Sequence, residues 1–128
     1  MRLLEKYADH AYALLRIVAG ALFFFHGAQK ILGAFGAARP PFASQLWFAG
    51  IIELAGGLAI MLGLGTRVAA FIASGEMAVA YFQVHWKFQL TDKLFPIVNQ
   101  GELAMLYCFL FLYIALKGPG PWSLAKRN

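Results

Sequence analysis

Four apolar runs of helical length constrain this chain more than any other feature. They cover roughly residues 11–32, 47–64, 68–86 and 100–117. Each run approaches the roughly 20 residues with which an α-helix crosses the hydrocarbon core of a bilayer. With 61% hydrophobic and 13% charged residues, the chain is also more apolar than an ordinary soluble domain. The sequence therefore predicts an all-α, integral membrane four-helix bundle that forms a single domain over residues 1–128.

Glycine and proline separate these runs. The first connection, "GAFGAARPPFASQ", contains residues that end helices and favour turns, and "GLGTR" is short enough to force the second and third runs into an antiparallel hairpin. Small residues gather in the same two runs, including Gly56, Gly57, Ala73 and Ser74. Because small residues let helix backbones approach each other in lipid, we expect these two helices to pack closely.

The distribution of basic residues predicts an orientation. Six lie at the termini and in the second connection: Arg2, Lys6, Arg67, Lys117, Lys126 and Arg127. Four lie on the other side: Lys30, Arg39, Lys87 and Lys93. Cytoplasmic loops of membrane proteins carry the excess of Lys and Arg, so both termini are predicted on the cytoplasmic side. The net charge of +5 then serves anchoring in the lipid bilayer, and no nucleic acid partner is predicted.

Three acidic residues fall inside the predicted spans, namely Glu53, Glu76 and Glu102. An ionisable residue at membrane depth is costly, faces the bundle interior and marks a functional site by default. The first span, which contains "LLRIVAGALFFFHGAQK", carries Arg16 and Lys30 on one helical face with His26 at its edge. We therefore expect these groups to point inward and meet the acids.

Depth along the helices suggests the pairs. At 1.5 Å per residue, His26 and Glu53 each lie about 9 Å from the outer ends of their spans, and Arg16 lies within a few Å of the depth of Glu76. We predict a pair of Arg16 with Glu76, and a pair of His26 or Lys30 with Glu53 or Glu102. For Lys30 the favoured alternative is a side chain that extends outward to the interface. The pairs could equally serve packing alone.

A polar site in the outer half of the bundle is the functional prediction. His26 and Glu53 are the predicted catalytic, proton-exchanging residues. The predicted ligand-binding residues are Arg16, Phe23, Lys30, Glu76, Tyr81 and Glu102. Aromatic side chains such as Phe23 and Tyr81 would flank a quinone ring. No metal site is predicted, and the single cysteine, Cys108, excludes an intrachain disulfide, so a redox role requires a cofactor or a partner.

Several segments resemble the DoxX family of small bacterial inner-membrane proteins. They are "HGAQK", "ELAGGLAIMLGLGTRVAA", "EMAVAYFQVHW" and "FPIVNQGELAMLYCFLFLYIALKGPGPWSL". The resemblance implies a four-helix bundle that spans the inner membrane several times. It also implies redox work, because family members include the quinone-reducing membrane subunit of a thiosulfate oxidoreductase and a subunit of a membrane-bound oxidoreductase complex.

The resemblance also implies which polar residues of this chain correspond to the family's motif residues. The family's motif residues match Arg16, His26, Gly27, Lys30, Glu53, Thr66, Arg67, Glu76, His85, Asn99 and Glu102. One departure is Gln100 in "NQGE", where the family commonly has glycine.

Three functions are compatible with these observations. The first is a quinone-interacting membrane subunit of an oxidoreductase complex that acts with a soluble or membrane redox partner. The second is a non-enzymatic scaffold or a binding protein for a small hydrophobic molecule, whose ion pairs are structural. The third, a proton-coupled transporter, ranks last because the polar groups gather in the outer half and no discontinuous helix is evident. Assembly of the chain into a homo-oligomer is compatible with each of these functions.

Overall fold

The computed structural model describes residues 1–125, and within them the chain is entirely helical apart from turns and loops. The four main helices are α2 (Ala8–Leu32), α3 (Gln45–Leu62), α4 (Thr66–Ala80) and α6 (Glu102–Lys117). A π-helical turn, η2 (Tyr81–Trp86), continues α4. Short elements complete the chain: α1 (Arg2–Glu5), η1 (Ala34–Gly36), η3 (Asp92–Leu94) and α5 (Pro96–Asn99). The all-α prediction is confirmed.

The bounds of α2, α3 and α6 agree with the predicted apolar runs to within three residues, and those of α4 do so when η2 is included, because turn residues end the helices. The chain leaves α3 at Gly63, whose φ of 74° lies in the left-handed region that glycine adopts without strain. At the other end of α3, Ser44 Oγ accepts a hydrogen bond from the amide of Trp47 at 3.2 Å. The third run is less regular than predicted, since its last six residues form the π-helical turn.

The closest backbone approach joins α2 to α3. A Cβ atom added at Gly27 would lie 2.2 Å from the backbone nitrogen of Leu54, and one added at Gly57 would lie 2.4 Å from that of Phe24. Only glycine permits this separation. The close packing predicted between the second and third spans therefore occurs instead between the first and second, because Gly50 and Gly57 of α3 face α2.

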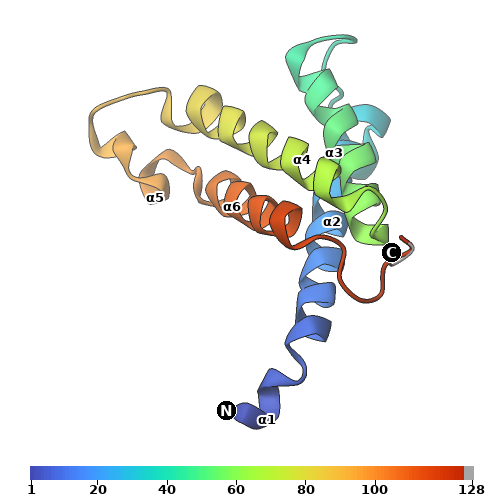
Figure 1. Ribbon diagram of the computed structural model, residues 1–128. Coiled ribbons are helices and arrows are strands. Elements are labelled where there is room, and N and C mark those ends of the chain that lie inside the picture. The colour runs from blue at the N-terminus through green and yellow to red at the C-terminus, as the bar shows by residue number, and fades with distance from the viewer. Residues whose placement is uncertain (126–128) are drawn as a thin grey trace.

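The second extensive pair is α4 with α6, which lie side by side (Figure 1). Ala70 and Ala73 of α4 are fully buried, so the helices can approach each other. Ser74 Oγ donates a hydrogen bond of 2.7 Å to the carbonyl oxygen of Cys108. Polar contacts of this kind hold helices together in an apolar environment.

Aromatic side chains join the two pairs, which cross each other obliquely (Figure 1). Phe23 of α2 is 1% exposed, and its ring centroid lies 4.7 Å from that of Phe111 of α6. The ring of Tyr107 stacks on Phe111 at 5.3 Å. Since long side chains rather than backbone contacts connect α2 to α6, the bundle leaves room between its pairs.

Two of the helices, α2 and α3, are long and apolar enough to cross a membrane. The orientation remains a prediction from charge, and Lys126 and Arg127, which contribute to it, lie outside the described residues. We call the end of the bundle at which α2 ends and α3 begins the outer end. The opposite end, at which α3 and α6 end and α4 begins, is the inner end.

Candidate functional site

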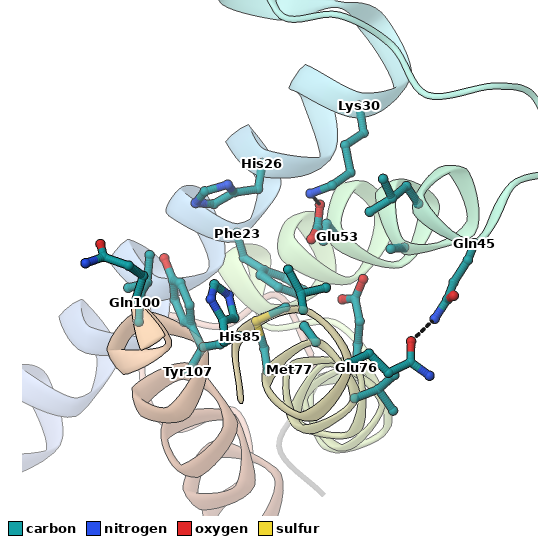
Figure 2. Close-up of a pocket in the computed structure, with 18 residues that line it drawn as sticks. Phe23, His26, Lys30, Gln45, Glu53, Glu76, Met77, His85, Gln100 and Tyr107 are labelled. Atoms are coloured by element: carbon teal, nitrogen blue, oxygen red, sulfur yellow. Dashed lines mark hydrogen bonds and ion pairs between the residues drawn. The ribbon is translucent and has the colours of Figure 1, made fainter. Parts of the chain in front are cut away.

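A cavity of about 500 Å³ opens toward the outer end between the two helix pairs (Figure 2). All four main helices and the π-helical turn contribute to its lining. Its ionisable and aromatic polar groups are His26, Lys30, Glu53, Glu76, His85 and Tyr107. A concave apolar space with a few converging polar groups is the usual form of a small-molecule site.

An ion pair lies on one wall of the cavity. Lys30 Nζ and Glu53 Oε2 are 2.6 Å apart, and the side chain of Glu53 is only 5% exposed. The Lys30–Glu53 pair is one of the pairs that depth predicted. The prediction that the Lys30 side chain extends outward to the membrane interface is wrong. The physical reason is that direct contact with a buried carboxylate stabilises the ammonium more than the interface would.

Glu76 of α4 lines the cavity beside this pair. Figure 2 shows its carboxyl group directed toward Glu53. Both of its oxygens are buried, and neither has a hydrogen-bond partner among the described residues. The predicted pair of Arg16 with Glu76 is therefore wrong.

Arg16 lies toward the inner end, outside the cavity. Its two terminal nitrogens donate hydrogen bonds of 2.8–3.0 Å to the carbonyl oxygens of Ile60, Met61, Pro121 and Trp122. The side chain is fully buried. Arg16 bonds to carbonyl oxygens because the last carbonyls of a helix have no partner within the helix, and the several N–H groups of a guanidinium can donate to more than one of them. Arg16 is thus a structural residue that fastens the C-terminal segment to the end of α3.

Arg67 has a similar place at the end of α6. Its guanidinium donates hydrogen bonds to the carbonyl oxygens of Ala115 and Lys117, at 3.0 and 3.3 Å, and also to that of Leu116. The short connection between α3 and α4 puts Arg67 in the first turn of α4, at the level where α6 ends. Both motif arginines therefore close helix ends at the inner side.

Tyr81, predicted to flank a ligand ring, lies outside the cavity lining. Its hydroxyl oxygen accepts a hydrogen bond of 3.2 Å from Asn99 Nδ2, and Asn99 Oδ1 accepts one of 2.8 Å from the amide of Gly101. Tyr81 thus supports the turn that starts α6. In that turn Gln100 adopts a φ of 65°, the conformation that the family's glycine would favour.

Glu102 also lies outside the lining, since it is exposed at the start of α6. The carboxylate stabilises the helix there by its position at the positive end of the helix dipole. The predicted residues that the structure does bring to one cavity are Phe23, His26, Lys30, Glu53 and Glu76.

Met77 and Tyr107 are among the lining residues that the sequence reasoning missed. A signal for Tyr107 exists, because Leu103, Ala104 and Tyr107 of α6 line the cavity at the spacing of one helical face. Met77 follows Glu76 directly and is buried. Its flexible thioether suits a wall that adapts to a ligand.

Two imidazoles face the cavity from different elements, His26 from α2 and His85 from η2 (Figure 2). Both are partly exposed, and neither makes a hydrogen bond to another residue within 1–125. A neutral imidazole carries one donor and one acceptor. Both rings can therefore bind a ligand oxygen or exchange a proton with it.

The exposed residues of the cavity lining are apolar side chains and three glutamines, Gln45, Gln83 and Gln100. Gln45 Nε2 donates a hydrogen bond of 2.6 Å to Gln83 Oε1. Leu46, Val84 and Leu103 are each 55% exposed and line the opening of the cavity, together with Val79 at 45%. If α2 and α3 cross a bilayer, exposed apolar side chains on the bundle face lipid tails. The cavity is thus accessible from the side of the bundle as well as from its outer end.

Comparison with known proteins identifies the family. The family model described as DoxX matches residues 11–86, which is more than half of the chain. The chain belongs to the DoxX family. DoxX proteins are membrane proteins, in agreement with the two candidate spans. The residues that line the cavity from α2, α3, α4 and η2 all lie within the matched region.

Two relatives cover most of this DoxX chain. A protein of Haemophilus influenzae named "Uncharacterized protein" is 45% identical over 134 residues, covering 99% of this chain and 97% of that protein. A Bacillus subtilis protein named "Putative oxidoreductase CatD" is 29% identical over 112 residues, covering 82% of this chain and 77% of that protein. No solved structure matches the chain significantly.

Proposed function

We propose that this DoxX chain is a membrane subunit of an oxidoreductase complex that binds a quinone in the outer cavity. The observation that carries the proposal is the cavity itself, which combines exposed apolar side chains at its opening with polar groups converging inside. Its volume of about 500 Å³ falls within the roughly 300–1,000 Å³ of small-molecule sites. The name of the Bacillus subtilis relative agrees with a redox role.

The lining suits the two parts of a quinone. Phe23 and Tyr107 provide aromatic surface for the ring, and their centroids lie 5.9 Å apart. The exposed apolar side chains of the lining, Val79, Val84 and Leu103 among them, would accommodate the lipid-soluble tail, which would extend into the bilayer. A ligand of this class can enter from the membrane without crossing water.

The polar groups suit the oxygens of the ring. A quinone supplies two-electron chemistry, and its reduction to a quinol takes up two protons. His26 can donate a hydrogen bond to a ring oxygen and exchange a proton with it. The Lys30–Glu53 pair lies on the same cavity and holds a proton donor beside an acceptor. Because the chain has a single cysteine and cannot form a dithiol pair, we assign the supply of electrons to a partner protein.

Binding of 1,4-naphthoquinone to the protein in lipid nanodiscs tests this proposal. We expect saturable binding that weakens about tenfold in His26→Ala and in Glu53→Gln, because each removes a polar group of the site. The matched control is His10→Ala, which changes an exposed histidine at the start of α2. Equal affinity for the wild type, His26→Ala and Glu53→Gln would exclude the proposal.

A second candidate is a non-enzymatic binding protein or scaffold. The two motif arginines favour it, because their hydrogen bonds all go to backbone carbonyls and stabilise helix ends. Such a protein would bind the ring compound without passing electrons to it. Reduction of bound naphthoquinone by membranes that contain the chain, and its loss in His26→Ala, would distinguish the redox subunit from the scaffold.

A further inference from the structure

Glu76 is a buried polar group of the outer cavity that the fold leaves without a hydrogen-bond partner among the described residues. The other two buried atoms without a partner there, Arg16 Nε and Thr66 Oγ1, belong to residues outside the cavity lining. The Glu76 side chain lines the outer cavity, and both carboxyl oxygens are shut away from the surface. Within the described chain, neither oxygen accepts a hydrogen bond. A buried acceptor without a donor costs free energy that a bound donor would restore.

The donors that could have served Glu76 act elsewhere. Lys30 Nζ contacts Glu53 at 2.6 Å, and Arg16 bonds to backbone carbonyls toward the inner end. The hydroxyl of Ser74, two residues before Glu76, donates to the carbonyl of Cys108. The fold thus uses these three donors elsewhere and leaves Glu76 directed toward the space between the helices (Figure 2). The two imidazoles of the lining, His26 and His85, make no hydrogen bond to Glu76 either.

The charge balance of the cavity points the same way. Lys30 neutralises Glu53 by direct contact, so Glu76 adds an acceptor that has no cation beside it. Such a wall favours a neutral molecule with a hydrogen-bond donor over an anion. With a volume of about 500 Å³, the cavity has room for a bicyclic aromatic ligand such as a naphthalene derivative.

We propose that Glu76 accepts a hydrogen bond from a ring hydroxyl of the ligand, so that the cavity prefers hydroxyl-bearing aromatic rings, the quinol class, over rings without a hydroxyl. This inference rests on the proposed function and names the ligand form that the site selects. A hydroxyl satisfies the carboxyl group in either protonation state, because at least one oxygen keeps free lone pairs. A ring that carries only ether oxygens offers Glu76 no donor.

The test compares ligands that differ in one hydrogen-bond donor. Binding of 1-naphthol, 1-methoxynaphthalene and 1,4-naphthoquinone is measured on the full chain in nanodiscs, and binding to empty nanodiscs is subtracted. For the wild type we expect 1-naphthol to bind about tenfold more tightly than 1-methoxynaphthalene. In Glu76→Leu this preference should fall to about twofold or less, because the acceptor is gone.

The matched control is Glu102→Leu, which removes an exposed acid at the same end of the bundle but outside the lining. It should keep the full preference for the hydroxyl. Should Glu76→Leu fail to fold, Glu76→Ala and the wild-type comparison still decide, since Ala also removes both acceptor oxygens and the same loss of preference is expected.

The outcomes separate the two proposals. Equal binding of 1-naphthol and 1-methoxynaphthalene to the wild type, or an unchanged preference in Glu76→Leu, overturns the role of Glu76 while naphthoquinone binding still supports the cavity as a quinone site. If none of the three rings binds, both the quinone site and the role of Glu76 are overturned.

Discussion

The ammonium of Lys30 and the carboxylate of Glu53 meet at 2.6 Å across the interface of α2 and α3. Gly50, one turn before Glu53, makes room for this contact, because a Cβ atom there would lie 2.7 Å from Cβ of Lys30. The pair therefore joins two functions. It holds the outer ends of two helices together, and it forms part of the cavity wall.

Removing one partner of this pair should destabilise the protein. Lys30→Met leaves the Glu53 carboxylate buried without a counter-charge, and we expect a loss of about 1–3 kcal/mol, reduced from the value for a dry pair because Lys30 is 25% exposed. The double variant Lys30→Met with Glu53→Leu should recover most of the loss. Thermal unfolding in detergent measures both, and Lys87→Met, at an exposed lysine of the same end, is the control. A double variant that is less stable than the single one would contradict the ion pair's role.

Arg16 should hold the C-terminal segment in place. Its guanidinium makes four hydrogen bonds to carbonyl oxygens, two of them in this segment. The amides of Leu124 and Ala125 also donate hydrogen bonds, to the carbonyl oxygens of Leu62 and Gly63. Arg16→Met removes the guanidinium and its four hydrogen bonds to carbonyl oxygens, at a cost of about 3 kcal/mol.

Hydrogen exchange measures this directly. Amides of residues 122–125 should exchange faster in Arg16→Met, and Arg16→Lys should rescue the protection only in part, because an ammonium lacks the planar fork. Arg39→Met, in the exposed loop after α2, is the control and should leave the exchange unchanged. Unchanged protection in Arg16→Met would show that other contacts fasten the segment.

Adjacent glycines of α3 should differ in their tolerance of a methyl group. A Cβ atom at Gly57 would lie 2.4 Å from the backbone nitrogen of Phe24, whereas one at Gly56 would meet nothing within 4 Å. Gly57→Ala should therefore force α2 and α3 apart and cost about 1–3 kcal/mol. Gly56→Ala should leave stability unchanged or raise it by up to about 1 kcal/mol through helix propensity. Thermal unfolding of the two variants checks the difference, and equal stabilities would contradict the close α2–α3 packing.

The sequence predicted the helices because local signals define them. Apolar length and the glycines at positions 33, 63 and 118 determine where α2, α3 and α6 end. The inward face of α2 was also predictable from its period, since Arg16, Gly20, Phe23 and Gly27 are all buried. What a single helix buries follows from its own residues.

The partners of the buried groups did not follow, because depth along a helix says nothing about direction around it. Arg16 and Glu76 lie at similar predicted depths, but Arg16 bonds to backbone carbonyls and Glu76 has no partner among the described residues. Every residue has a backbone carbonyl, so the sequence does not indicate which of them accepts a bond from Arg16. Tyr81 starts a π-helical turn, where the rotation per residue differs from the 100° assumed for an α-helix. Sequence reasoning thus found most of the cavity's ionisable residues and included the Lys30–Glu53 pair among its alternatives, but it gave Glu76 the wrong partner.

Photoaffinity labelling tests the central claim, a quinone site in the outer cavity, most directly. The full chain in nanodiscs would be irradiated with an azido-naphthoquinone and the modified residues mapped by mass spectrometry. We predict labels on the cavity segments of α2 (residues 23–30), of α4 and η2 (76–85) and of α6 (103–107), all suppressed by excess 1,4-naphthoquinone. Labels confined to outward-facing residues such as Phe71 and Phe109, unaffected by the competitor, would contradict it.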